Sequence, residues 1–587
     1  MKDKSNKLTR VMLNSLIPAQ ILSAALANVS GFLNSIITGS LLGAESIAAI
    51  SFIQPVSMII AMLGGGIASG AQVLCGRCVG RGDGEGANRV FSISAMWSLL
   101  LGAILTFACL AFSQPIASLM GARGDDLVRC ADYIRGMSWS IVFMLFSTAL
   151  MSFMQLDNAS NISLLATAVL LAANIAFDFI NVSAFHMGIY GIGLATTFGY
   201  LAMMLVGLVY YVSKKCNFRF KLSAFSLKES GELFYIGLPG AFSPLALALR
   251  ALVLNNICFR LAGTIGVSAV GIFYSMSGFV SSLANGVGNS AGILSSVFVG
   301  ERNRSSLQEL GPMSMRKAYT MHIIAYVITW LTAKPFAILF GTSAGDMPFV
   351  IHAIRCSMTC LLVNPVTCIS MNMYKGLGST RLVSICAVLD YFVFQCLFSQ
   401  VFSGVLGIEA VWFSSIFSEL ATYLILVLFF RRRAGKLPKN PFDFIYISDS
   451  VSAKAENCYD ASMRTLGEVE KVSQEVIELS KSKGIDPRRS YYCGLCIEEQ
   501  CSNIILHGFT KGGDVSKFSI ELRLIFEDGN VIISLRDNCK KFDPTNWHRK
   551  ENEPDPMKGM GIRMVQQLAE SVSYRHTLGL NVLSIEI

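Results

Sequence analysis

Long apolar segments fill most of the first 430 residues of this sequence and limit its fold more than any other feature. An α-helix needs about 20 apolar residues to cross the hydrocarbon layer of a membrane, and these segments reach that length. Twelve can be distinguished, at residues 12–37, 46–73, 91–114, 136–156, 162–184, 190–213, 233–258, 266–297, 319–341, 347–373, 382–403 and 407–430. The sequence predicts an all-α polytopic bundle of twelve helices in the lipid bilayer.

The composition agrees with a membrane protein that also has some soluble mass. Of 587 residues, 53% are hydrophobic and 15% are charged, whereas soluble proteins carry about a quarter charged residues. The net charge of +9 does not indicate a nucleic-acid partner, because Lys and Arg gather at the ends of apolar segments. The first segment is too long for the apolar part of a cleaved signal peptide, so none is expected.

The basic residues predict the orientation of the bundle. Alternate connections and both tails carry most of the Lys and Arg residues, from Lys2 to the cluster at residues 431–433. The other connections carry only Arg123, Arg129, Arg135, Arg260 and Lys334. Because cytoplasmic connections hold the excess of positive charge, we expect a multi-pass protein of the bacterial inner (plasma) membrane with both termini in the cytoplasm.

The two halves of the bundle resemble each other. "VGRGD" follows Pro18 by about the same interval as "VGERN" follows Pro239, and "GIYGIG" before the sixth segment resembles "GVLGIE" before the twelfth. These pairs predict two six-helix lobes, which in transporters surround a central site. We divide the chain into a tail (1–11), a first lobe (12–213), a loop (214–232), a second lobe (233–430), a linker (431–445) and a C-terminal domain (446–587).

Several motifs in order resemble the multidrug and toxic compound extrusion (MATE) family. They are the early "IP", "LLGAESIAAI", "GGGIASG" followed by "GRCVGRGD", "NIAFDF" before "GIYGIGLATT", and "GLPGA" at the start of the second half. The resemblance covers about residues 12 to 430. It implies an antiporter coupled to Na⁺ or H⁺ that exports small organic or drug-like substrates.

One position departs from the family pattern. Many members carry an Asp in the first span, whereas the matching residue here is Asn34, whose amide cannot exchange a proton at physiological pH. Polar groups inside a membrane usually face a cavity or a partner. Residues with a possible role in the transport pathway are therefore Asn34, Gln54, Asn174, Asp178, Arg250, Asn255 and Asp390. Pairing or hydrogen bonding between helices is the structural alternative for each of them.

After residue 445 the composition changes, because charged residues become frequent and long apolar segments stop. The patterns predict an α+β domain with helices at 464–483, 488–508 and 559–572, a β-hairpin at 517–537 and a closing strand at 580–587. About 140 residues are enough for one soluble domain. We expect it on the cytoplasmic side, where ATP is present.

The segment "EEQCSNIILHG" places Glu499, Asn503 and His507 four residues apart, on one face of a helix. With Asp537 and "GMGIRMV" further on, it resembles the GHKL fold shared by histidine kinases and HSP90, and within that fold the serine kinases that act on anti-anti-sigma factors. By that resemblance Asn503 holds Mg²⁺ beside ATP, and Glu499 is the general base. By the same resemblance, Asp537 accepts a hydrogen bond from the adenine amino group, and the backbone N–H groups at Gly559 and Gly561 approach the phosphates.

Further expectations follow from this resemblance. Residues 545–558 are expected to form a lid, and His507 is either a nucleotide contact or a packed helix residue. The family pattern at the adenine strand has two glycines, whereas this chain reads Asp537-Asn538-Cys539-Lys540-Lys541. ATP binding is expected in spite of this change, and ATPase or serine/threonine kinase activity is left open.

Three functions fit these observations. The preferred one is an efflux antiporter that carries a cytoplasmic ATP-binding regulatory domain. The alternative is a membrane-tethered serine/threonine kinase or ATP sensor that acts on a regulatory protein substrate and uses the bundle as its receptor. A pump powered directly by ATP is disfavoured, because the domain has no P-loop and occurs once.

Overall fold

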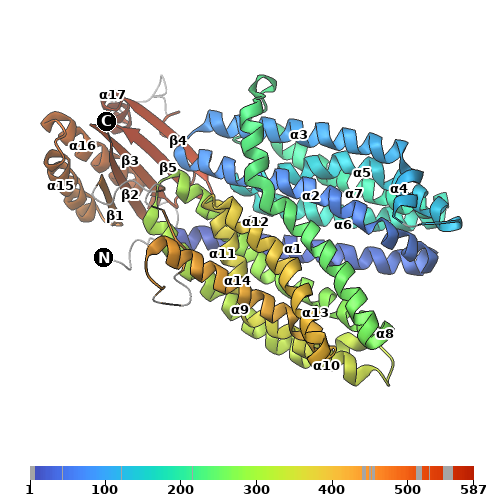
Figure 1. Cartoon of the computed structure of the whole chain (residues 1–587). Helices are drawn as coiled ribbons and strands as arrows, with labels where there is room; N and C mark the ends of the chain where they lie inside the picture. Colours follow the sequence, from blue (N-terminus) through green and yellow to red (C-terminus); the bar gives the residue numbers. More distant parts are fainter. Residues whose placement is uncertain are drawn as a thin grey trace.

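The computed structural model describes residues 7–42, 44–120, 122–213, 216–340, 342–438, 440, 444–448, 451, 457–509, 518–527, 529–546 and 559–587. These residues form a long helical bundle with a small α+β domain at one end (Figure 1). We call the end of the bundle that contacts this domain the domain end, and the opposite one the far end. The expected fold class is confirmed.

The first lobe is entirely helical. Its elements are α1 (Lys7–Leu42), α2 (Ala44–Arg81), α3 (Gly84–Ala111), α4 (Ser113–Leu119), α5 (Asp125–Leu156), α6 (Ser160–Ile180), the π-helix η1 (Asn181–Phe185) and α7 (Gly188–Val212). A short 3₁₀ turn, η2 (Leu222–Ala224), lies in the connection to the second lobe. The six segments expected in this lobe all fall on these helices.

The second lobe begins with a helix of unusual length, α8 (Leu227–Gly300). At 1.5 Å per residue its 74 residues would extend about 110 Å, far more than a bilayer. Gly263, with φ 63° and ψ −151°, breaks it into two arms, 227–262 and 264–300. The seventh and eighth expected segments are therefore two arms joined at Gly263, where a loop was expected.

The remaining expected segments of the second lobe also fall on helices, several of them interrupted. The elements are α9 (Arg304–Leu339), α10 (Met347–Ser357), η3 (Met358–Leu362), α11 (Asn364–Gly376), α12 (Thr380–Val388), the π-helix η4 (Leu389–Phe394), α13 (Gln395–Leu406) and α14 (Glu409–Ala434). Within the described residues, ten helices are long and apolar enough to cross a membrane, and a pair bent by 46° at residue 363 makes up to eleven.

The two lobes are joined at the domain end and separate at the far end. One large apolar core contains residues of both lobes, such as Leu156 and Leu294, and lies toward the domain. At the far end each lobe has a core of its own, around Ile141 in the first lobe and Trp412 in the second. The lobes accordingly diverge away from the domain in Figure 1.

The internal repeat is visible in two turns at the domain end. In residues 80–83 the third residue, Gly82, has φ 79°, and Asp83 caps α3 by accepting from the backbone of Gly86. In residues 300–303 the third residue, Arg302, has φ 52°, and Asn303 caps α9 in the same way. The second position differs in charge: Arg81 in the first turn corresponds to Glu301 in the second.

The C-terminal domain is one antiparallel sheet covered by helices on one face (Figure 1). Its strands are β1 (Cys458–Met463), β2 (Ile520–Glu527), β3 (Asn530–Asp537), β4 (Ser571–Thr577) and β5 (Leu580–Glu586), in the order β1-β2-β3-β5-β4. Its helices are α15 (Leu466–Ser482), α16 (Pro487–Asn503), the π-helix η7 (Ile504–Phe509) and α17 (Met560–Leu568). The apolar side chains of alternate strand positions pack with these helices in a separate core.

The expected elements of this domain need two corrections. The helix expected at 559–572 ends at Leu568, because residues from Ser571 onward pair with β5 as strand β4. Strand β1, which pairs with β2 at the sheet edge, was not expected. Most of the expected lid, residues 547–558, lies outside the described residues.

Candidate functional site

Helix α16 carries the expected nucleotide-binding pair. Asp486 caps its N-terminus by accepting from the backbone of Arg488 and Arg489. Its buried face, formed by Cys493, Cys496, Ile497 and Cys501, packs on the sheet. This packing fixes the rotation of the helix and leaves the Glu499 and Asn503 side chains half-buried on an adjacent side.

Beyond Asn503 the helix widens into the π-helix η7, an irregularity that often occurs at functional sites. His507 lies in this segment and is exposed, so the packed alternative for it is wrong. Its neighbour Gly508 lies against the turn that follows β3: a Cβ there would come within 3.0 Å of Cys539 Sγ. The end of α16 and the expected adenine strand therefore lie side by side.

Asp537 ends β3 and is 5% exposed. Its Oδ1 accepts from the backbone N–H of Cys539 and from Asn581 Nδ2, both at 2.9 Å. Burial raises the pKa of this carboxyl, and these hydrogen bonds oppose the shift. Asn581, which lies opposite Asp537 on β5, was missed at the sequence level because its partner strand is set only by the register of the sheet.

The two missing glycines leave no strain in this turn. Neither Cys539 nor Lys541 is among the described residues that have a positive φ. The turn is therefore built without the left-handed conformation that glycine favours. Cys539 instead fills the space next to Gly508 and is 7% exposed. The Cys539 side chain therefore occupies space that a glycine would leave empty, while the backbone of the turn needs no positive φ.

The two glycines at the start of α17 lie near the acid of α16. Gly559 caps α17 with φ 70°, and a Cβ at Gly561 would lie 2.0 Å from Glu499 Oε2. The helix N-terminus and the Glu499 carboxylate thus share one small space, and a side chain at position 561 would displace that carboxylate. Backbone N–H groups at such a terminus suit phosphate oxygens.

These residues fit a nucleotide with Mg²⁺. The amide oxygen of Asn503 is a hard ligand of the kind that Mg²⁺ takes in small number beside phosphate oxygens. The cradle at Gly559 and Gly561 could hold the phosphates, and the Asp537 carboxylate has acceptor capacity left for an adenine amino group. Glu499 would be placed to accept a proton from water or a hydroxyl group.

A second polar cluster is buried inside the second lobe. Asp390, in η4, accepts from Ser418 at 2.8 Å, and its backbone oxygen accepts from Gln395 at 3.2 Å. Arg250 reaches the same Gln395 with Nη1 at 3.4 Å and stacks over the Tyr274 ring at 4.1 Å. The structure thus connects two expected pathway residues, Arg250 and Asp390, through one side chain.

This cluster contains an acid that was missed at the sequence level. Glu419 follows Ser418 on α14 and is 6% exposed. It accepts hydrogen bonds from Asn364, at 2.7 Å, and from Thr367. The sequence signal that could have identified it is the position of an acidic residue in the middle of the apolar segment 407–430.

The other expected pathway residues lie apart from this cluster. Asn174 and Asp178 are buried one turn apart on α6 of the first lobe, where Asn174 donates to Thr196 at 3.4 Å. Gln54 on α2 and Asn255 on α8 are exposed. Asn34 lies in α1, but its side chain is outside the described part of the structure.

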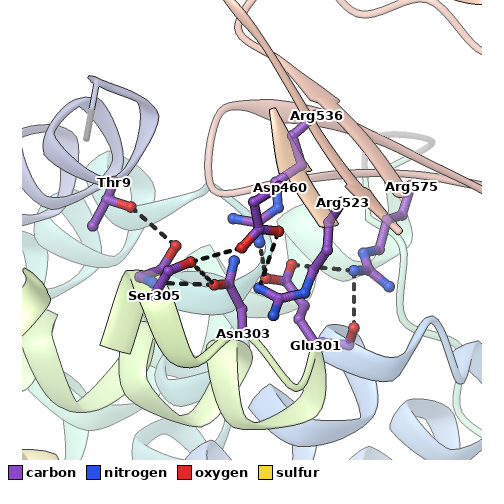
Figure 2. Close-up of polar contacts among 10 residues, drawn as sticks. Thr9, Glu301, Asn303, Ser305, Asp460, Arg523, Arg536 and Arg575 are labelled. Carbon is purple, nitrogen blue, oxygen red and sulfur yellow. Dashed lines mark hydrogen bonds and ion pairs between the residues drawn. The ribbon is translucent and has the colours of Figure 1, made fainter. Parts of the chain in front are cut away.

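The C-terminal domain meets the bundle at a charged contact centred on Glu301, between α8 and α9 (Figure 2). The carboxylate of Glu301 forms an ion pair with Arg536 of β3 at 2.5 Å and another with Arg575 of β4 at 3.4 Å. Glu301 is 7% exposed and Arg536 is 4% exposed, so the pair is shielded from water. Removing one member of such a pair costs about 3–5 kcal/mol.

Arg575 also contacts the first lobe. Its Nη2, which lies 3.4 Å from Glu301 Oε1, donates to the backbone oxygen of Gly80 at 3.0 Å. Gly80 and Glu301 belong to the two repeated turns, one from each lobe. A single guanidinium group therefore bridges the lobes.

Further contacts surround this bridge. On the first-lobe side, Leu8 donates its backbone N–H to Glu521 at 3.3 Å. On the second-lobe side, Ser305 donates to Asp460 at 3.2 Å (Figure 2), and Arg302 pairs with Glu527 at 2.6 Å. Three apolar residues of the β4–β5 hairpin, Leu578, Leu580 and Val582, belong to the core that both lobes share.

The fold and these sites define a two-lobed membrane bundle joined to an ATPase-type domain. The chain belongs to the MatE family, which matches residues 19–180 and 239–401. Its C-terminal domain is a histidine kinase-like ATPase domain, matched over residues 463–587. The resemblance inferred from the sequence is confirmed for both parts.

Relatives and solved structures match the bundle. The multidrug export protein MepA of Staphylococcus aureus is 24% identical over 430 residues, 71% of this chain and 93% of MepA. MepA of Staphylococcus saprophyticus is also 24% identical, with the same shares.

The solved structures share the fold of the bundle. An outward-facing MATE transporter of the MOP superfamily superposes with a TM-score of 0.67 at 22% identity, over 72% of this chain and 95% of that one. A MOP superfamily transporter from Pyrococcus furiosus, whose binding pocket is described as having reverse polarity, gives 0.67 at 22% identity over 74% and 98%.

Proposed function

We propose that this chain is a cation-coupled exporter of small organic or drug-like molecules whose transport is regulated by its ATP-binding domain. The family and the multidrug export proteins among its relatives support the export activity. The observation that carries the regulatory part is the Arg575 bridge between the lobes. The basic connections lie at the domain end, which supports a cytoplasmic location for that end and for both termini.

Coupling to Na⁺ or H⁺ is assigned to the buried acids. Acidic groups inside a membrane commonly serve as ion or proton sites. Asp178 in the first lobe, and Asp390 with Glu419 in the second, are the carboxylates that can do this, whereas Asn34 supplies an amide. The hydrogen bonds that join Arg250 to Asp390 through Gln395 favour the second lobe, where Glu419 directly follows Ser418, the partner of Asp390, on α14.

Regulation follows from where the domain lies. The lobes meet closely at the domain end: a Cβ at Gly80 would lie 2.1 Å from the backbone oxygen of Val297. Alternating access by rocking opens this end and separates the two turns. Arg575 must then release Gly80 or Glu301, so docking of the domain stabilises the state that is closed toward the cytoplasm.

The sheet connects the nucleotide site to this bridge. Arg536 and Asp537 are consecutive on β3, and consecutive side chains point to opposite faces of a strand. Asp537 faces the helices that carry Asn503, and Arg536 faces Glu301 of the bundle. A nucleotide that shifts the end of β3 therefore acts on the ion pair directly.

Reconstitution of the full chain into liposomes tests this function. Export of a fluorescent organic cation is measured with a Na⁺ gradient, with a pH gradient and with neither, each with and without Mg-ATP. The proposal expects export that needs a gradient, with a rate that Mg-ATP changes in the parent chain but not in Asn503→Ala. Export that ATP drives without a gradient contradicts it, as does phosphorylation of a protein acceptor in a chain that exports nothing, which favours the kinase alternative.

A further inference from the structure

A cavity of about 940 Å³ lies at the domain end, between α9, the end of α14 and residues 445–447. Four cationic side chains line it: Arg304 and Arg316 of α9, and Arg433 and Lys436 at and beyond the end of α14. No acidic residue occurs among the described residues of its wall. The exporter function does not account for this cavity, because the part of its wall that the structure describes contains no residue of the polar cluster in the second lobe and none of the nucleotide site.

The preference for positive charge in cytoplasmic connections explains why cations occur here, but not why they surround one cavity. Arg304 and Arg316 are twelve residues apart, about 18 Å along a helix, so the charges lie along its length. Four cationic residues in one wall give the cavity a positive potential, which favours a bound anion. Planar guanidinium groups suit phosphate oxygens in particular, because they can donate two parallel hydrogen bonds.

The cavity is also partly apolar, and it lies at the membrane edge. Leu307, Pro312, Phe430 and Ile445 contribute to its wall. Phe430 is the last residue of the apolar part of α14, directly before the Arg cluster, so this part of the wall is at the level where a bilayer ends. A ligand with a phosphate group next to an acyl region matches both parts of the wall.

We propose that this cavity binds a phosphate-bearing anion, and that its place at the membrane edge selects the headgroup of an anionic phospholipid. Basic pockets between membrane helices on the cytoplasmic side are suited to such headgroups. A free polyphosphate has the same phosphate chemistry but does not use the apolar wall, so the two sources can be separated by experiment.

Binding at this place has a structural consequence for the link between bundle and domain. The wall residue Tyr446 donates its backbone N–H to the Tyr374 hydroxyl at 3.0 Å, and that hydroxyl donates to the backbone oxygen of Phe444 at 2.9 Å. Arg304 lies between Asn303 and Ser305, and Ser305 contacts Asp460 of the domain. A bound headgroup therefore holds the linker and the docking turn together.

The test uses the full chain in detergent, with native mass spectrometry to count bound phosphatidylglycerol against phosphatidylcholine. Arg316→Gln combined with Arg433→Gln removes two charges from the wall. Arg431→Gln combined with Arg432→Gln removes two charges from the same helix end without touching the cavity, and serves as the control. At about fivefold for each charge that contacts the headgroup, the first pair is expected to weaken phosphatidylglycerol binding about 30-fold. The control, whose charges do not line the cavity, is expected to weaken it less than about threefold.

A second arm adds pyrophosphate, measured by calorimetry on the same variants. Preferential binding of phosphatidylglycerol that depends on Arg316 and Arg433, and is not displaced by pyrophosphate, supports the lipid site. Pyrophosphate binding with the same dependence, without lipid preference, overturns the lipid assignment. Equal lipid binding by the parent and both variants overturns the site itself. Lys436→Gln, at an exposed position beyond α14, repeats the test if the double variant does not fold.

Discussion

The guanidinium of Arg575 and the backbone oxygen of Gly80 lie 3.0 Å apart, although 495 residues separate them in sequence. This contact ties the last strands of an ATPase-type domain to the first repeated turn of a transporter bundle. The same nitrogen contacts Glu301 in the second repeated turn. The internal repeat thus provides the two halves of a docking site whose charges differ, with Arg81 in one turn and Glu301 in the other.

Glu301→Gln is expected to loosen the domain from the bundle. The substitution leaves Arg536 buried without its ion pair, so docking should weaken by roughly 3 kcal/mol, the lower end of the range for buried pairs. Hydrogen exchange of the β3 and β4 amides in the full chain measures this as faster exchange.

Arg302→Gln is the matched control, because Arg302 and Glu527 pair with side chains 49% and 46% exposed. An exposed pair contributes about 0–1 kcal/mol, so exchange should change little. Equal exchange in the two variants would show that the buried pair does not hold the domain.

Substitutions on α16 should separate nucleotide binding from turnover. Asn503→Ala is expected to weaken Mg-ATP binding by about tenfold or more, because it removes the proposed ligand to the ion. Glu499→Gln should keep binding and lower any ATP turnover by about 10²–10⁴-fold, the usual contribution of a general base.

Glu498→Gln on the same helix is the control, since its side chain is exposed. Fluorescent-nucleotide titration and phosphate release by the full chain provide the two readouts. If Asn503→Ala binds Mg-ATP as well as Glu498→Gln does, the assignment of this helix fails.

Glu419→Gln is expected to reduce gradient-driven export by about tenfold or more, because a neutral amide cannot exchange a proton or balance a bound cation. Glu409→Gln makes the same change at the first turn of the same helix, where the side chain is 37% exposed and pairs with His352, and should leave export intact. Transport assays in liposomes, with a Na⁺ gradient and with a pH gradient, compare export by the two variants. Loss of export in both variants would indicate damage to α14 instead of a coupling role.

Docking of the domain should depend on pH through Glu521. Burial raises the pKa of Glu521 to about 7, while Arg536 and the N–H of Leu8 oppose the shift. A carboxyl whose pKa is raised on docking favours the docked state below its ordinary pKa of about 4.3, and this contribution is lost as the pH rises through about 7. Docking should therefore weaken between pH 5 and pH 8.

Hydrogen exchange of β2, corrected for the intrinsic pH dependence, measures this change, and Glu521→Gln should remove it. A parent chain with the same pH response as Glu521→Gln would rule out this carboxyl as the cause.

Most of the fold could be predicted from the sequence. The length of the apolar segments indicates membrane-spanning helices, and the alternation of apolar and polar residues indicates the strands of a packed sheet. The Glu499–Asn503 spacing on a helix was also predictable, because it depends on local geometry alone. The two arms of α8 were expected as separate helices, because a single Gly263 does not show whether a loop or a sharp bend follows.

The docking face could not be predicted. Arg523, Arg536 and Arg575 each follow a Leu or a Tyr in their strands, and the same pattern occurs in a strand with one face in water. Only the tertiary arrangement shows that this charged face meets Glu301. Glu419 was missed for a related reason: its hydrogen-bond partners, Asn364 and Thr367, come from another helix.

The central claim is that the domain, through Arg575, holds the lobes together at the domain end. Spin labels at the exposed positions Arg81 in the first lobe and Arg381 in the second, with the half-buried cysteines replaced, allow their separation to be measured in the full chain. A charged hydrogen bond contributes about 1.5–3 kcal/mol, so Arg575→Ala should shift the population from the short toward the long distance by roughly tenfold or more. The same distance distribution in the parent and in Arg575→Ala would contradict the claim.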